Sequence, residues 1–142
     1  MNPRISHKFY LSLLEFLVTS KQHIVAMGSE FGLTDIQAIA LLLLDEHYPR
    51  PMKNFCLLFH CDASNVTGII DGLEKKQLVS RQNDLHDRRV KVVQLEPAGK
   101  RLQQAMLTRL DEANDFLFGP LSVAERQQFV TIVEKLAGCK QR

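Results

Sequence analysis

The 142-residue sequence predicts a mostly α-helical protein with one small β-hairpin. Apolar residues recur every three or four positions through most of the chain, which is the spacing of amphipathic helices. Between residues 79 and 95 the pattern changes to short β-prone runs on either side of a polar turn at residues 83–87. This arrangement is typical of a hairpin.

The first two helices are expected at residues 5–31 and from Thr34 onward. Apolar residues fall at near-helical spacing through the first segment. Thr34 and Gln37 form a capping box, because each side chain can bond the other residue's backbone N–H. The helix continues through residues 38–44, which are apolar nearly all round, so it should be the most buried helix. Residues 49–51, Pro-Arg-Pro, stop it.

A third helix over about residues 52–60 and a fourth helix that begins at Asp62 form a helix-turn-helix pair. The Asp62 carboxylate can accept a backbone N–H of the first turn of the fourth helix. That helix has an apolar stripe and an opposite face of small polar residues. Strand side chains alternate between two faces. On the returning strand of the hairpin, we therefore expect one face to carry Asp87, Arg89, Lys91, Val93 and Leu95.

Two more helices follow the hairpin. Pro97 suits a first helical turn because its missing N–H is not needed there. Gly119 and Pro120 break this helix, and Ser122 with Glu125 forms a second capping box that opens the last helix.

Large apolar residues lie on the first helix and on the last two, with little else in the chain to cover them. We therefore expect a homodimer built from residues 1–31 and 97–138. The alternative is that these helices fold back on their own protomer.

Positive charge is concentrated in one stretch. Residues 75–91 carry six basic and two acidic residues, a net charge of +4, whereas the whole chain carries only +2. A nearly neutral protein with such a local basic surface is suited to contact a polyanion. The alternative is a solvated basic hairpin without a partner.

Four ordered and correctly spaced segments resemble the MarR family of bacterial transcription regulators: residues 62–67 (DASNVT), 73–76 (LEKK), 78–81 (LVSR) and 87–89 (DRR). The resemblance implies that residues 1–142 are a single protomer, with a winged helix-turn-helix at residues 34–96 and dimerisation helices on either side. It also implies a homodimer that binds a pseudo-palindromic operator in double-stranded DNA and acts as a repressor.

Residue roles follow from the resemblance and from groove geometry. Ser64 and Asn65 should lie close to base edges in the major groove, where Asn can bond adenine with two hydrogen bonds. Thr67 is the right size to reach a phosphate. Arg89 matches the wing arginine of the family, a minor-groove probe, and Asp87 can orient it. The expected phosphate contacts, which set affinity more than sequence preference, are Lys75, Arg81, Arg88 and Lys91. For each basic residue the alternative is a role in surface solubility.

Several positions depart from the family pattern. Gln77 stands where a glycine usually ends the recognition helix, so it must adopt a left-handed conformation or close the turn differently. His60 occupies a turn position that favours glycine. Gly68 replaces a position that is often basic. These changes bear on the target sequence rather than on the fold.

The resemblance also implies that the signal is a small aromatic or phenolic effector. Its pocket would be lined by Phe9, Leu13, Phe16, His23, Leu43, His47 and Phe55, although core packing explains the apolar members equally well. Thiol sensing through Cys56 and Cys61 is the alternative, since a helix N-terminus after Cys61 would lower the pKa of its thiol. Both cysteines can also be small buried hydrophobes. Neither they nor Cys139 shows a recognised metal-ligand spacing with the scattered histidines, so we expect no metal and no cofactor.

Composition excludes several classes of protein. The N-terminus lacks a secretion signal, and the most apolar run, residues 38–44, is shorter than the roughly 20 residues that cross a bilayer. Three cysteines without a spaced framework indicate a reducing compartment, so we expect a cytoplasmic protein without a membrane partner. The sequence contains no motif of a phosphate loop, a nucleophile elbow or a zinc protease, and we expect no enzyme. A winged helix that binds only proteins is the other alternative.

Overall fold

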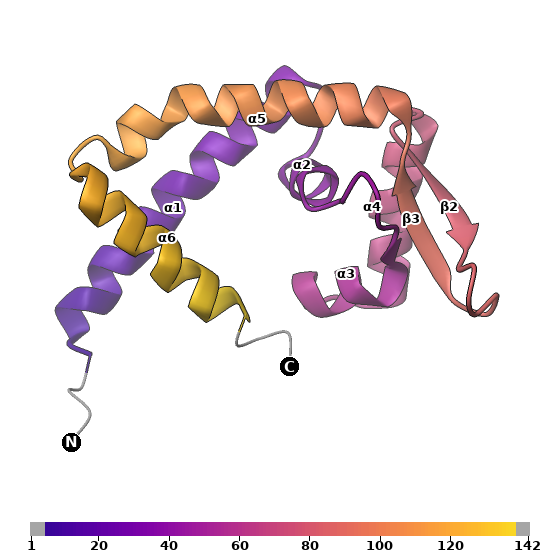
Figure 1. Ribbon diagram of the computed structural model, residues 1–142, viewed down its shortest axis with the longest axis horizontal. Helices are drawn as coiled ribbons and strands as arrows, with labels where there is room; N and C mark the ends of the chain where they lie inside the picture. Colours follow the sequence, from indigo (N-terminus) through magenta and orange to yellow (C-terminus); the bar gives the residue numbers. More distant parts are fainter. Residues whose placement is uncertain (1–4, 139–142) are drawn as a thin grey trace. The chain divides into compact units, whose positions relative to one another are not determined.

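The computed structural model describes residues 5–138, which form a mostly helical protein with a small antiparallel sheet (Figure 1). The chain divides into two compact units, residues 1–109 and 110–142, and the boundary lies inside the fifth helix. In the described residues no single helix is long and apolar enough to cross a membrane, although α1 and α2 pass that test as a pair bent by 91°. The elements in order are α1 (His7–Glu30), α2 (Asp35–Leu42), β1 (Arg50–Pro51), α3 (Met52–Phe59), α4 (Ala63–Lys75), β2 (Val79–Asn83), β3 (Lys91–Leu95), α5 (Pro97–Phe118) and α6 (Val123–Gly138).

The start of α2 confirms the predicted capping box. The Gln37 N–H donates to Thr34 Oγ1 at 3.2 Å, and the Thr34 N–H donates to Gln37 Oε1 at 3.1 Å. None of the eight residues of α2 is exposed, as its apolar composition predicted. The other end of α2 is capped from α5, because the side-chain amide of Gln103 donates to the carbonyls of Leu41 and Leu44 at 2.8 Å each. The first half of α5 is thereby fixed to the buried centre of its unit.

The helix-turn-helix consists of α3 and α4, as predicted. Asp62 is the N-cap of α4, and its carboxylate accepts the Asn65 N–H at 2.9 Å. The predicted apolar stripe of α4 packs inward, since Val66, Ile70 and Leu73 are buried. This packing turns the opposite, polar face of α4 outward.

The sheet contains one strand that the sequence analysis missed. Its order is β1-β3-β2, with both pairs antiparallel. The strand β1 is only two residues long, and Arg50 pairs with Val93. The sequence analysis assigned Arg50 and Pro51 only to a helix stop, because two residues show no periodicity. Pro51 is tolerated here because β1 is an edge strand.

The hairpin also begins its return later than predicted. The strand β3 starts at Lys91, so Asp87 and Arg89 lie in the turn and not on a strand face. The turn is closed by the Val90 N–H, which donates to the Asp87 carbonyl at 2.9 Å, and by the Asp84 N–H, which donates to the Val90 carbonyl at 2.9 Å. These two bonds close a turn, so residues 87–90 do not belong to β3.

Two residues adopt left-handed backbone conformations where glycine would be the ordinary choice. Gln77 has φ 58°, which confirms the costlier of its two predicted options, and His60 has φ 50°. Each closes a turn directly after a helix of the helix-turn-helix, so both turns carry a steric cost that glycine would avoid.

The hydrophobic core lies almost wholly in the lobe formed by residues 27–95. Every buried hydrophobic residue of the described chain is in this range except Met106. The largest fully buried side chains include Phe55, Leu41 and Ile70. By contrast, α1 exposes many large apolar residues, including Leu11, Leu14 and Val18.

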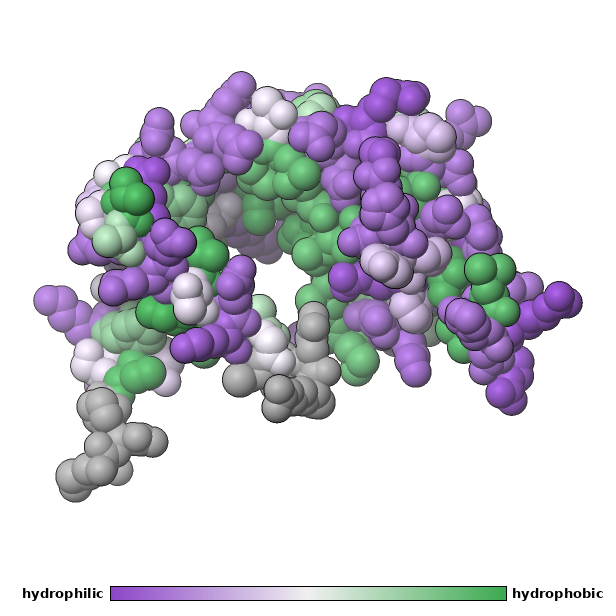
Figure 2. All heavy atoms as spheres, in the orientation of Figure 1, coloured by the Kyte–Doolittle hydropathy of each residue, from purple (hydrophilic) through white to green (hydrophobic). Residues whose placement is uncertain are grey.

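The second unit has its own local contacts and little buried surface. The predicted capping box is present, with the Ser122 N–H donating to Glu125 Oε2 at 2.8 Å and the Glu125 N–H donating to Ser122 Oγ at 3.2 Å. The rings of Phe118 and Phe129 pack with centroids 5.8 Å apart. No residue of α6 is buried. Figure 2 shows hydrophobic residues at the surface in the region of α6 and in the region of α1.

Candidate nucleic-acid interface

The outward face of α4 begins with small polar side chains on a capped helix end. Ser64, Asn65 and Gly68 are exposed, and Thr67 is half-buried. The Ser64 hydroxyl donates to Asp62 Oδ1 at 2.9 Å, beside the bond from the Asn65 N–H. Hydrogen bonds from the Asn65 backbone and the Ser64 hydroxyl hold the pKa of Asp62 below its usual value, so this cap is charged at neutral pH. The first turn of α4 is therefore capped and accessible.

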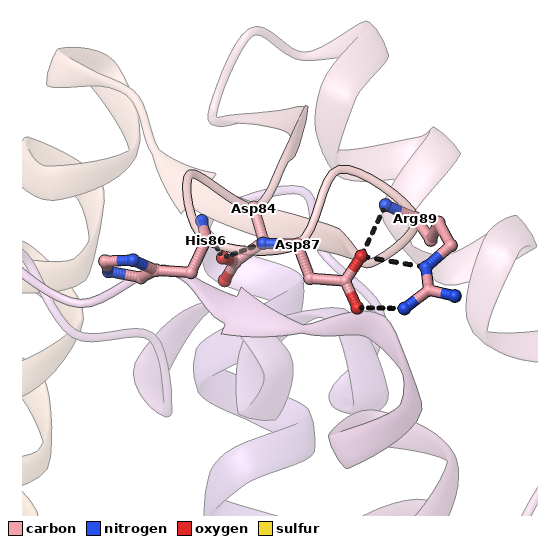
Figure 3. Close-up of polar contacts among 4 residues, drawn as sticks. All are labelled: Asp84, His86, Asp87 and Arg89. Carbon is pink, nitrogen blue, oxygen red and sulfur yellow. Dashed lines mark hydrogen bonds and ion pairs between the residues drawn. The ribbon is translucent and has the colours of Figure 1, made fainter.

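The hairpin turn fixes an exposed arginine at its tip. Figure 3 shows the Arg89 side chain beside the Asp87 carboxylate, to which its Nε and Nη2 donate at 3.1 and 3.2 Å. The Arg89 backbone N–H donates to the same carboxylate at 3.1 Å. The Arg89 side chain is nevertheless 91% exposed. The predicted contact between Asp87 and Arg89 is present, but a turn produces it rather than a shared strand face.

A second carboxylate shapes this turn. Asp84 Oδ1 accepts the N–H groups of His86 and Asp87 at 2.7 and 3.2 Å (Figure 3). Hydrogen bonds from the Arg89 side chain and backbone hold the pKa of Asp87 below its usual value, so the Asp87 carboxylate is ionised at neutral pH. Asp84 was not among the predicted site residues. Its role could have been recognised from its place near the start of a polar turn. An Asp side chain at such a place commonly bonds the backbone two residues later.

Arg81 is held differently from the other basic residues. Its Nη2 lies 2.6 Å from Asp71 Oδ1 and 2.7 Å from Glu74 Oε2, both on α4. Arg81 was predicted to contact phosphate, and in this structure its guanidinium pairs with two carboxylates. The contact instead fixes β2 to α4.

The remaining predicted phosphate contacts lie on exposed positions. Lys75 ends α4, Arg88 lies in the hairpin turn and Lys91 opens β3, and all three residues are exposed. Lys91 Nζ donates to Asn83 Oδ1 at 2.6 Å across the hairpin. Three of the four predicted phosphate contacts are thus available to solvent on the same lobe.

The position of Phe55 changes the set of residues that can be assigned to the predicted effector pocket. This ring is fully buried, stacks on Phe59 with centroids 6.0 Å apart and lies under the Arg50 guanidinium at 5.6 Å. Phe55 is therefore a core residue, which corrects its assignment to a ligand pocket.

The other predicted pocket residues are spread along the first unit. Phe9 and Leu13 are exposed on α1, whereas Phe16 and His23 are half-buried. His47 is exposed in a turn, where its N–H donates to Asp45 Oδ1 at 2.7 Å. Two shallow depressions in the described structure, one beside Gln77 and Arg101 and one on α6, include none of these residues.

The thiols do not match a reactive sensor. Cys56 and Cys61 are free and half-buried, and Cys139 lies outside the described residues. Burial raises the pKa of the Cys61 thiol, and the nearby charges of Cys56 and Asp62 raise it further. The expected lowering of the Cys61 pKa by the helix N-terminus is therefore wrong, because burial, Cys56 and Asp62 all raise it. In the described residues no group of three or more His, Cys, Asp or Glu side chains could hold a metal ion.

Comparison with known proteins agrees with this geometry. A family model described as the MarR family matches residues 33–91. The HTH-type transcriptional repressor NicR of Pseudomonas putida is 28% identical over 104 residues, which cover 73% of this chain and 66% of NicR. The alignment thus spans slightly less than two thirds of that relative.

Solved structures match over nearly the whole chain. A probable transcriptional regulator from Pseudomonas aeruginosa is 31% identical, with a TM-score of 0.63 over 86% of this chain and 95% of that one. BpsR of Bordetella bronchiseptica, whose DNA binding is regulated by 6-hydroxynicotinic acid, is 23% identical, with a TM-score of 0.73 over 96% of this chain and 98% of that one. The capped helix of the helix-turn-helix and the hairpin wing agree with these likenesses: residues 33–91 match the MarR family, and the fold is that of MarR structures.

Proposed function

We propose that this protein is a sequence-specific DNA-binding repressor that acts as a homodimer on a pseudo-palindromic operator. The observation that carries the proposal is the exposed, capped start of α4 on the same lobe as a wing whose Arg89 is exposed and oriented by Asp87. This function requires the compartment that holds the chromosome, which is the cytoplasm in bacteria.

The start of α4 is proposed to read base edges in the major groove. Ser64 and Asn65 are exposed in its first turn, and an Asn side chain can form two hydrogen bonds to adenine. Thr67, one turn further from the cap, is proposed to bond a phosphate. Rigidity supports this role, because the Asp62 cap leaves the first turn little freedom to lose on binding.

The wing is proposed to probe the minor groove through Arg89. A guanidinium is attracted to a narrow minor groove, where the negative potential is enhanced. Lys75, Arg88 and Lys91 are proposed to contact phosphates, which sets affinity and salt dependence. Arg81 is proposed to act indirectly, by holding β2 against α4 through Asp71 and Glu74.

Dimerisation is proposed to occur through α1, α5 and α6. Their exposed apolar side chains are too numerous for a surface that stays in water, because scattered single residues are normal but contiguous apolar surface is not. Two copies related by a two-fold axis would present two α4 helices to two half-sites about one helical turn apart.

The proposed signal is a small aromatic effector that releases the protein from DNA. NicR is a repressor by name, and BpsR responds to 6-hydroxynicotinic acid, so aromatic acids of this kind are the first compounds to test. The proposed pocket keeps Phe9, Leu13, Phe16, His23, Leu43 and His47 and omits Phe55. An effector should raise the melting temperature of the protein and lower its operator affinity.

The test of DNA recognition uses operator fragments selected from genomic DNA by the purified protein. We expect Arg89→Ala to weaken operator binding by about 1–3 kcal/mol. Lys91→Ala should weaken binding to all sequences alike and reduce the salt slope by about one. The control is Arg101→Ala, an exposed arginine of α5 beside the C-terminal end of α4. Wild-type binding that is no tighter to selected fragments than to random DNA would overturn the proposal.

A further inference from the structure

The turn of the hairpin carries a leucine that is almost wholly exposed. Leu85 is 95% exposed, the highest value among the large hydrophobic residues of the described chain. It lies between β2, which ends at Asn83, and β3, which begins at Lys91. A single exposed leucine is ordinary by itself. This one is distinguished by how its backbone is held and by the charges that surround it.

Hydrogen bonds restrain the backbone on both sides of Leu85. Asp84 Oδ1 accepts the His86 N–H at 2.7 Å and the Asp87 N–H at 3.2 Å, so one carboxylate bridges the backbone around the leucine. The Asp84 N–H also donates to the Val90 carbonyl at 2.9 Å and closes the turn. Such restraint lowers the entropy cost of burying the leucine side chain against a partner.

The charge beside Leu85 indicates which kind of partner could bury it. Arg88 and Arg89 follow in the same turn, Lys91 opens β3, and all three residues are exposed. The Arg89 Nε donates to the Asp87 carboxylate at 3.1 Å, and the Arg89 side chain is 91% exposed. Figure 2 shows hydrophobic atoms at the surface in the region of the hairpin, next to strongly hydrophilic ones. An apolar side chain among exposed cations is complementary to DNA, because phosphates bind the cations and unstacked bases offer apolar faces to the leucine.

We propose that Leu85 is an apolar wedge that enters the minor groove beside Arg89 and partly unstacks one base step. Apolar side chains inserted in this way kink a duplex toward the major groove. The cost of unstacking depends on the sequence, since pyrimidine–purine steps such as TA and CA open most easily. Leu85 therefore selects a flexible step without a hydrogen bond to any base. This inference rests on the proposed function, because it requires that the wing meets the minor groove.

The wedge and the arginine contribute to binding in different ways. Arg89 carries a charge, so Arg89→Ala should reduce the salt slope of operator binding by about one. Leu85 carries none, so Leu85→Ala should weaken operator binding about tenfold through lost apolar burial and leave the salt slope unchanged. Fragments selected by the wild type should be enriched in pyrimidine–purine steps at the wedge position, and those selected by Leu85→Ala should not.

The experiment measures base stacking in complexes of the full-length protein with selected operator duplexes. The fluorescent analogue aminopurine replaces one adenine at a time, and its emission rises where the base is unstacked. Wild type and Leu85→Met should raise the emission at one step beside each half-site, whereas Leu85→Ala should raise it at none. Leu57→Ala is the matched control, because Leu57 of α3 is another exposed leucine of the same lobe, at 73%. It should give the wild-type signal, and circular dichroism should show that all variants are folded.

A mismatched base pair at the opened step provides a second readout. A mismatch lowers the energy needed to unstack a base, so the wild type should bind the mismatched duplex about tenfold more tightly than the paired one. Leu85→Ala should bind the two duplexes alike, whereas Arg89→Ala should keep the difference.

Three results would overturn the wedge: no rise in emission with the wild type, an equal rise with Leu85→Ala, or equal operator affinity of Leu85→Ala and the wild type. Equal affinity would assign the exposed leucine to a protein partner instead. A wild type that binds selected fragments no more tightly than random DNA would refute the proposed function. Non-specific complexes at low salt would still bring the wing to DNA, so the aminopurine signal on a random duplex would still decide for or against Leu85.

Discussion

The lobe of residues 27–95 and the helices at the two ends of the chain use their apolar residues in opposite ways. The lobe buries Leu41, Phe55, Ile70 and Val93 completely, whereas α6 buries no residue at all. Large apolar side chains of α1 such as Leu14 are more than half exposed. The same kind of amphipathic helix therefore completes a core within one protomer in the first region and leaves an uncovered apolar face in the second.

This difference indicates a division of labour. The lobe has the packing that a rigid reading surface needs, with Asp62 and Asp87 fixing the two side-chain groups that are proposed to meet DNA. The terminal helices have the surface that a second copy of the chain would cover.

The largest effect is expected from a charge placed on the exposed apolar helices. Leu14→Glu or Leu136→Glu should raise the dimer dissociation constant roughly a hundredfold, because an unpaired carboxylate in a buried interface costs about 3 kcal/mol. Operator affinity should fall as the dimer dissociates. Sedimentation measures the dimer, and Tyr48→Glu, at an exposed aromatic residue outside these helices, is the control. If one of these variants kept the wild-type dimer dissociation constant, the helix face that carries its substitution would lie outside the interface.

The next effect concerns the close packing of the lobe against α5. A Cβ atom at Gly99 would lie 1.9 Å from the Leu78 carbonyl oxygen, which accepts the Glu96 N–H at 3.0 Å. Gly99→Ala should therefore destabilise the protein by about 3 kcal/mol in urea unfolding. The matched control is Gly68→Ala on the outer face of α4, where no atom lies within 4 Å of the added carbon. That change should stabilise the protein by about 1 kcal/mol, and equal effects of the two substitutions would contradict this packing.

A smaller gain in stability is expected at the end of α4. Gln77 is strained at φ 58°, and glycine adopts this conformation without a steric cost. Gln77→Gly should raise the free energy of unfolding by about 1 kcal/mol. Gln77→Ala keeps the strain and should give no such gain. A loss of stability in the glycine variant would show that the Gln77 side chain makes a contact that outweighs the strain.

The smallest effect is a pH dependence at the α4 cap. The pKa of Asp62 in the folded protein lies below its ordinary value of 3.8, so the stability it contributes is present above that pH and is lost as the pH falls through the lowered value. Asn is also a good N-cap but does not titrate. The difference in unfolding free energy between wild type and Asp62→Asn should therefore shift in favour of the variant at acid pH. A difference that is constant with pH would contradict the charged cap.

Local signals were sufficient to predict much of this structure. Both capping boxes and the Asp62 cap join residues only three apart, so the sequence contained both partners of each bond. The left-handed conformation at Gln77 was one of two options that followed from the family resemblance, because a glycine usually stands at this position. The contact between Asp87 and Arg89 is equally local, and it was predicted even though the strand assigned to it was wrong.

Features that depend on distant partners could not be predicted. The strand β1 exists because Arg50 meets Val93, which lies far along the chain. Arg81 was assigned to phosphate because the sequence does not show which carboxylates of α4 face β2. The Phe55 ring is apolar whether it lines a pocket or a core, and its burial against Phe59 became visible only in the folded lobe.

The most direct test of the account is the mass of the complex between the protein and a selected operator duplex, measured by sedimentation or native mass spectrometry. The account predicts two protomers on one duplex with two-fold-symmetric half-sites, and no complex of this composition for Leu14→Glu under the same conditions. A tight, sequence-specific complex that contains a single protomer would contradict it, because the exposed helices would then not be completed by a second copy on DNA.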